Sequence, residues 1–134
     1  MRPSVLTYRV VVEPLLWGNE EQIDNIKNNY DTFDFIIGSD VLYEPLNYPD
    51  LLQTIRRLSG RDTVIIFGYP KRHLGEEQFL REASQFFDVS SHKIELENRN
   101  HVHIHICQLR HIKVSLIKIL IVLMNSIRHV LIFQ

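Results

Sequence analysis

The sequence has little cysteine, little glycine and no long uninterrupted apolar run. Its single cysteine, Cys107, excludes an internal disulfide framework and indicates a reducing compartment such as the cytoplasm. No two of its five glycines lie closer than seven residues, so the chain contains no G-x-G turn. The longest charge-free stretch near the C-terminus, residues 119–127, is far shorter than the roughly 18 apolar residues that a membrane-spanning helix needs. A membrane span is therefore not expected, although an interfacial helix stays open.

Negative charge is missing from the end of the chain. All 16 acidic residues lie between Glu13 and Glu97, and only basic charges follow. The formal net charge of −1 over 134 residues gives no general reason to expect a nucleic-acid partner. With 45% hydrophobic and 23% charged residues, the composition is typical of one globular domain with a buried core.

The order of apolar and polar segments predicts an α/β fold. The apolar run within residues 33–39 is typical of a strand that is covered on both faces. Leu51, Leu52 and Ile55 share one face of a predicted helix that ends before Gly60. The full order is strands 5–13 and 33–39, helix 46–58, strand 62–69, helix 76–87, and strands 88–96 and 101–109, with residues 19–30 as a short polar helix or a loop. The short polar link between the last two strands favours an antiparallel hairpin.

The C-terminal segment, residues 111–134, differs in composition from the rest. It is rich in Ile, Leu and Val, with Lys113, Lys118 and Arg128 scattered through it. We expect an apolar, basic and helical tail that lies outside the domain formed by residues 1–110. The alternative is that the segment packs on this domain or on another chain.

Two predicted strands end in side chains that suit a binding site. Ser39 and Asp40 directly follow an apolar strand, and Tyr43 lies three residues after the acid. Trp17 follows the first predicted strand and supplies one large, flat aromatic side chain. Because ligands of open α/β sheets bind outside the carboxyl ends of the strands, these four residues predict half of a binding crevice.

Several motifs, taken in order, resemble those of one enzyme family. They are Leu16-Trp17-Gly18, the run from Phe33-Asp34 to Ser39-Asp40-Val41-Leu42-Tyr43, Leu51-Leu52-Gln53-Thr54-Ile55, Tyr69-Pro70-Lys71-Arg72 and His101-Val102-His103-Ile104-His105. Over residues 5–110 the chain resembles the C-terminal half of a seven-strand, class I S-adenosylmethionine-dependent methyltransferase. It is most similar to the methyltransferase-like protein-lysine methyltransferases, which modify chaperones, AAA ATPases and translation factors. The resemblance implies part of a Rossmann-like sheet, strands three to seven, with the last two as an antiparallel hairpin.

The resemblance also implies a role for each residue at the strand ends. Trp17 would stack beside the adenine of S-adenosylmethionine, and Ser39 would pass close to the same cofactor. Asp40 would orient the ammonium of a substrate lysine or the supporting loop, and Tyr43 would wall the lysine channel. Asp40 and Tyr43 are thus candidate catalytic residues, Trp17 and Ser39 are candidate cofactor-binding residues, and no metal is expected.

One part of the family pattern is missing from this sequence. The family binds its cofactor with a glycine-rich turn after the first strand and an acid that ends the second. Without those two strands, the resemblance implies a truncated enzyme that does not turn over by itself and whose sheet exposes strand edges. One alternative is an enzyme completed by a partner chain. The other is a non-catalytic interaction protein that uses the strand edges and the C-terminal tail.

Simpler explanations exist for each candidate residue. Trp17 could be a core aromatic, Asp40 a turn or helix-cap residue, and Tyr43 a packing residue. Lys71 and Arg72 are expected to be solvated loop charges.

The last predicted strand carries three alternating histidines. His101, His103 and His105 project from one face, where a metal could bind, but a half-exposed edge face is the preferred interpretation. Cys107 on the same strand is expected to be a small core residue rather than a nucleophile.

Overall fold

The computed structural model describes residues 11–95, 103–110 and 130–133, with only the backbone of residues 95, 103–107, 110 and 130. In chain order the elements are α1 (Glu20–Asn29), β1 (Phe35–Ser39), the 3-10 helix η1 (Pro45–Asn47), α2 (Tyr48–Leu58), β2 (Val64–Pro70), α3 (Glu76–Ala83), β3 (Asp88–Glu95), β4 (His103–Arg110) and β5 (Val130–Phe133). Helices alternate with the first strands, so the predicted α/β class is confirmed.

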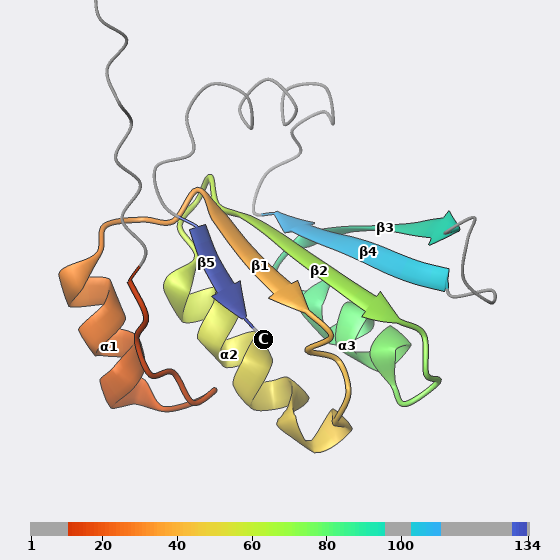
Figure 1. The fold of residues 1–134 in the computed structure, drawn as a ribbon, viewed down its shortest axis with the longest axis horizontal. Helices are drawn as coiled ribbons and strands as arrows, with labels where there is room; N and C mark the ends of the chain where they lie inside the picture. The colour runs from red at the N-terminus through yellow and green to blue at the C-terminus, as the bar shows by residue number, and fades with distance from the viewer. Residues whose placement is uncertain (1–10, 96–102, 111–129, 134) are drawn as a thin grey trace, which may run out of the picture.

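The described strands form one five-stranded sheet in the order β3-β4-β2-β1-β5 (Figure 1). β1 pairs in parallel with both β2 and β5, whereas β4 pairs antiparallel with β2 and β3. The predicted hairpin of the last two strands is therefore confirmed as β3 and β4. The parallel pairing also places Ser39 beside Gly68, so the carboxyl ends of β1 and β2 lie at one edge.

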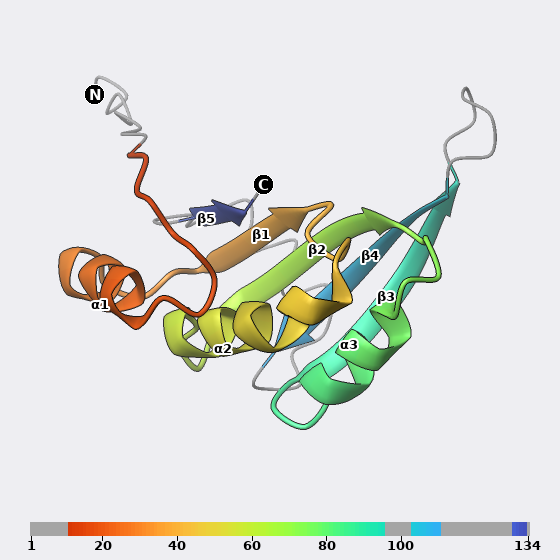
Figure 2. The same ribbon diagram turned by 90° about the horizontal axis from the view of Figure 1, so that it is seen from below.

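The three α-helices of the described residues lie on the same side of the sheet (Figure 2). Alternate residues of β2 point toward them, because Ile65, Phe67 and Tyr69 are buried while their neighbours are half-buried. The Phe79 ring of α3 lies 6.1 Å from that of Phe67, centroid to centroid. Leu51 of α2 is fully buried in the same cluster. The burial of each such side chain contributes roughly 1.5–3 kcal/mol to stability. The packed helices therefore hold the sheet, including the edge at which β1 and β2 end, in a fixed position.

Residues 19–30, for which the sequence left a helix or a loop open, contain the helix α1. The Asn19 side chain caps it by accepting a hydrogen bond from the Gln22 N–H at 3.0 Å. Acids in its first turn suit the positive end of the helix dipole. Ile23 and Ile26, its only apolar pair, are both buried.

Element boundaries differ from the predicted ones near proline and at the end of α3. Helix 46–58 is split, because η1 starts at Pro45 and α2 follows with Pro49 in its first turn. Helix 76–87 ends at Ala83, whose carbonyl accepts the N–H groups of both Phe86 and Phe87. This tighter turn leads the chain into β3.

The described residues of the first predicted strand, 11–13, do not support it. Residues 5–10 lie outside the described part of the chain, and residues 11–13 belong to no strand. Val12 is 89% exposed, which shows that its β-branched side chain has no sheet to pack on. Local strand propensity alone does not form a strand without a pairing partner.

The expectation of a separate helical tail is wrong for residues 130–133. These residues form β5, which pairs along the outer edge of β1 from Phe35 to Gly38. The apolar sequence Val130-Leu131-Ile132-Phe133 suits a strand, and pairing satisfies backbone groups that β1 would otherwise expose. The edge of β1 is thus occupied by the chain itself. Residues 111–129 lie outside the described part, and in the described helices none is long and apolar enough to cross a membrane.

Candidate functional site

Four segments meet where β1 ends. The segment after β1 is joined to the end of β2, because the Asp40 N–H donates to the Gly68 carbonyl at 2.7 Å. On the other side of β1, Phe133 pairs with Gly38. The fourth segment is the loop before α1, which carries Trp17. We call this the carboxyl edge; it comprises residues 13–19, 38–44, 68–75 and 133.

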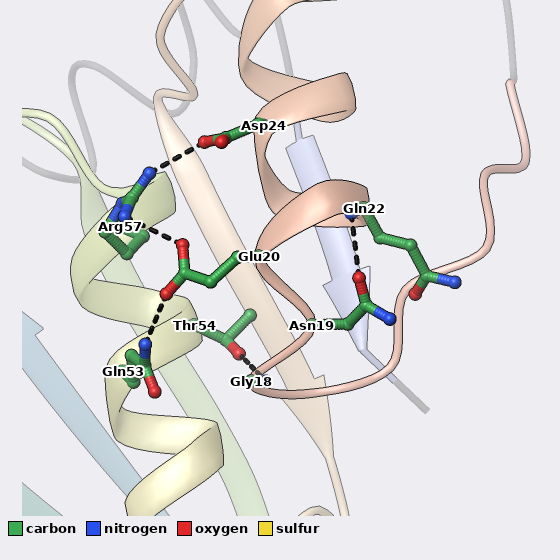
Figure 3. Close-up of polar contacts among 8 residues, drawn as sticks. All are labelled: Gly18, Asn19, Glu20, Gln22, Asp24, Gln53, Thr54 and Arg57. Atoms are coloured by element: carbon green, nitrogen blue, oxygen red, sulfur yellow. Dashed lines mark hydrogen bonds and ion pairs between the residues drawn. The ribbon is translucent and has the colours of Figure 1, made fainter.

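The loop that carries Trp17 is fixed onto α2 through Gly18. The Gly18 N–H donates to the Thr54 hydroxyl at 2.8 Å (Figure 3). That hydroxyl in turn donates to the Asp50 carbonyl at 2.7 Å. Gly18 has φ of 79°, a left-handed conformation that favours glycine. A Cβ there would lie 2.8 Å from an Asp50 carboxylate oxygen, so any other residue would have to displace that side chain in addition to adopting a strained φ.

Charged contacts hold α1 beside α2 and so support the same loop. Arg57 binds Glu20 at 2.8 Å and Asp24 at 2.7 Å, and Gln53 also donates to Glu20 (Figure 3). These side chains are about half exposed, so each pair adds only a few tenths of a kcal/mol to about 1 kcal/mol. Their geometric effect is to fix the start of α1, three residues after Trp17.

Trp17 and Tyr43 come into contact, as the sequence predicted. Their ring centroids lie 6.4 Å apart with the planes tilted by 48°. A second ring, Phe133 of β5, lies 6.5 Å from Trp17 at a tilt of 58°. Trp17 packs on the edge of the core but stays partly exposed. The Phe133 contact was missed, because a pairing between segments so far apart leaves no periodic pattern in the sequence.

The segment that carries Tyr43 is fixed by buried contacts of the residues before it. Val41 and Leu42 are buried, and the Tyr48 hydroxyl donates to the Leu42 carbonyl at 3.2 Å. Burial raises the pKa of Tyr48, which therefore keeps its proton as a donor. Tyr43 itself is 52% exposed, so its ring is available to a ligand at the carboxyl edge.

Asp40 lies at the same edge but is already engaged. The guanidinium of Arg72 contacts both of its carboxylate oxygens, one from Nη1 and the other from Nη2 at 2.9 Å. These hydrogen bonds hold the pKa of Asp40 below its usual value. Asp40 does not cap a helix, because Glu44 caps η1. The carboxylate is thus ionised and turned toward the loop after β2.

Lys71 and Arg72 are charges of an exposed loop, as expected, but each of them also forms an ion pair. Both are partly exposed, but Lys71 pairs with Glu77 at 2.7 Å and Arg72 pairs with Asp40. The partners lie on neighbouring segments that sequence alone does not bring together. The Arg72–Asp40 pair spans 32 positions of the chain.

The other candidates are less constrained. Ser39 ends β1 with an exposed side chain, as a residue near a bound ligand should. Among the described residues, no group of three His, Cys, Asp or Glu side chains could hold a metal ion. The side chains of His101, His103, His105 and Cys107 lie outside the described part, so their predictions stay untested.

Comparison with known proteins identifies a family. Residues 2–86 match a family model described as lysine methyltransferase. The chain is 32% identical over 108 residues to the protein N-lysine methyltransferase METTL21A of Xenopus tropicalis, covering 81% of this chain and 46% of that protein. The mouse METTL21A is 31% identical over 108 residues, covering 81% of this chain and 47% of that protein.

This chain spans about half the length of those curated relatives. Among solved structures, the M1.HpyAVI–SAM complex is similar at a TM-score of 0.41 and 14% sequence identity. That likeness covers 68% of this chain and 50% of the other. Similarity at this level adds nothing to the family assignment, which depends on the sequence matches.

Proposed function

Because the chain belongs to the lysine methyltransferase family, we propose that it acts in transferring a methyl group from S-adenosylmethionine to a lysine of a protein substrate. The main structural support is the contact between Trp17 and Tyr43 at the carboxyl edge. An indole and a phenol from separate loops meet there, beside the exposed end of β1. Such an edge is where open α/β sheets bind ligands.

The described residues fit the adenosine part of the cofactor. Trp17 is partly exposed, and both of its ring neighbours are tilted rather than stacked, so neither covers it face to face. Ser39 is exposed at the end of β1. The chain contains no G-x-G turn for the methionine end, so we expect the isolated chain to bind the cofactor weakly.

The cofactor supplies an electrophilic methyl carbon on a positively charged sulfur. The task of the protein is to place an uncharged lysine nitrogen in line with that carbon, because an ammonium has no free electron pair. Tyr43 would line one side of the channel that the substrate lysine enters, and Asp40 would orient the lysine side chain. Because Arg72 lowers the pKa of Asp40, this carboxylate is a poor proton acceptor, and the lysine proton would pass to water.

By resemblance, we propose a non-histone substrate such as a chaperone, an AAA ATPase or a translation factor, modified in the cytoplasm. The curated relatives are about twice as long as this chain, which leaves room for a partner chain in completing the site. The described surface gives no specific support to the alternative of a purely non-catalytic interaction protein, since β5 occupies the edge of β1.

Methylation in an extract tests the proposal. Purified chain would be added to cytosolic extract with methyl-labelled S-adenosylmethionine, and new methyl-lysine would be read by mass spectrometry. We expect label that is lost with Trp17→Ala and Tyr43→Ala, each checked for folding by circular dichroism. Equal labelling by all three proteins would contradict the proposal. Label with extract but not with the chain on a purified substrate would show that a partner is needed.

A further inference from the structure

The loop after β2 is built to present Arg72. The carboxylate of Glu76 accepts hydrogen bonds from the Arg72 N–H at 2.6 Å and the Leu74 N–H at 2.8 Å. Glu76 is only 2% exposed. Burial raises the pKa of Glu76, but its backbone N–H donors outweigh burial and lower it overall. A buried, ionised carboxylate thus fixes the backbone from which Arg72 reaches Asp40.

Backbone strain lies on both sides of the Arg72–Asp40 pair. Asp40 has φ of 56° and His73 has φ of 58°, and these are the positive-φ non-glycine residues of the described chain. Such conformations are unfavourable for residues that carry a Cβ, and they persist where the surroundings enforce them. The Asp40 N–H bond to Gly68 and the Glu76 contacts supply that enforcement. The geometry of the Arg72–Asp40 pair is therefore fixed by the surrounding backbone, unlike that of a chance surface contact.

We propose that Arg72 is a positioning residue of the acceptor-lysine site, which aims the Asp40 carboxylate and keeps it from forming a tight ion pair with the incoming ammonium. This inference rests on the proposed function. An unpaired carboxylate would favour the charged, unreactive form of the lysine. With Arg72 in place both oxygens are already hydrogen-bonded, yet a carboxylate retains lone pairs that can orient a neutral amine. The adjacent guanidinium charge also disfavours a second cation.

The other charges at this site are accounted for. Glu76 is bound by backbone N–H groups, and Lys71 is paired with Glu77. His73 lies in the same loop and acts on Glu76 electrostatically. Among the described contacts, Arg72 is the cation that touches Asp40. Its removal should therefore change the behaviour of this carboxylate, whereas removal of the neighbouring Lys71 should not.

The test follows the Asp40 carboxyl carbon by ¹³C NMR, with the signal assigned through Asp40→Asn. The probe is n-butylammonium chloride, a mimic of the lysine side chain, compared with sodium chloride at equal ionic strength. We expect no specific shift in the wild type or in Lys71→Gln, a shift in Arg72→Gln, and little or none in Arg72→Lys. Lys71→Gln makes the same charge change one residue away. A specific shift of equal size in the wild type and Arg72→Gln would overturn the proposal.

A second readout applies to the active system. Arg72→Gln should lower kcat while KM for the protein substrate falls or stays unchanged, and Arg72→Lys should restore kcat in part. A residue with only a structural role would instead raise KM or lower the melting temperature. Absence of methyl transfer from every protein, wild type included, would count against the proposed function alone. The NMR comparison would still decide the role of Arg72.

Discussion

The hydroxyl of Thr54 should control the position of Trp17, and Thr54→Val isolates it. Valine keeps nearly the same volume and shape, so no large cavity forms in this fully buried position. What is lost is the acceptor for the Gly18 N–H, 2.8 Å away. The loop that carries Trp17 then has no direct hydrogen bond to α2 at this point.

The expected cost follows from that unpaired donor. A donor left unsatisfied away from water costs about 1–3 kcal/mol, and the Gly18 N–H is only partly buried, which favours the lower half of that range. The lost hydroxyl donation to the Asp50 carbonyl adds little, since that carbonyl lies within α2, where it can accept a helical hydrogen bond. We therefore expect Thr54→Val to lower the free energy of unfolding by about 1–2 kcal/mol.

Urea unfolding followed by circular dichroism measures this loss. Trp17 is the single tryptophan of the chain, so its fluorescence reports directly on the carboxyl edge. We expect the emission of Thr54→Val to move to longer wavelength as the indole becomes more exposed. Thr32→Val, at an exposed position, is the matched control and should change stability by less than about 0.5 kcal/mol. Equal midpoints and equal emission for Thr54→Val and the wild type would refute this account of how Trp17 is placed.

Four further variants test the sheet and its edge. Gly38→Ala would place a Cβ 2.6 Å from the Phe67 ring and should cost about 1–3 kcal/mol, whereas Gly68→Ala meets no atom within 4 Å and should be nearly neutral, as urea midpoints would show. Phe133→Ala removes a buried ring and should cost about 3 kcal/mol or more with a shift of tryptophan emission to longer wavelength. Folding lowers the pKa of Asp40. The ion pair therefore stabilises the native state fully at a pH above the usual aspartate pKa of about 4, and this stabilisation is lost as the pH falls through the lower pKa of the folded state. Asp40→Asn should therefore be less stable than the wild type at neutral pH, by a small amount that vanishes in acid, measured by thermal unfolding across pH.

Sequence periodicity succeeded where local pattern and final structure obey the same physics. The apolar face of α2 follows the 3.6-residue repeat, and β2 contains an apolar run that is followed by Gly68 and Pro70, so both elements were predicted close to their observed bounds. The meeting of Trp17 and Tyr43 followed from the rule that ligand-binding residues gather at the carboxyl ends of strands.

Partner choice in space was not predictable in the same way. Arg72 looked like a solvated charge because nothing in its own neighbourhood shows that Asp40, 32 positions away, turns toward it. Its position depends on the left-handed backbone of Asp40 and on Glu76, which is buried although glutamate usually is not. Both are exceptions to local propensity, and such exceptions are expected at functional sites.

The placement of β5 bears directly on how this carboxyl edge should be compared with those of relatives. The lysine methyltransferase match covers residues 2–86, which includes Trp17 and Tyr43. Phe133 lies outside that range, yet its ring touches Trp17 and its strand covers the edge of β1. One wall of the candidate adenine site therefore comes from a segment outside the match. Because a neighbouring aromatic ring changes both the exposure and the orientation of the indole, the proposed function predicts that cofactor affinity depends on Phe133 as well as on Trp17.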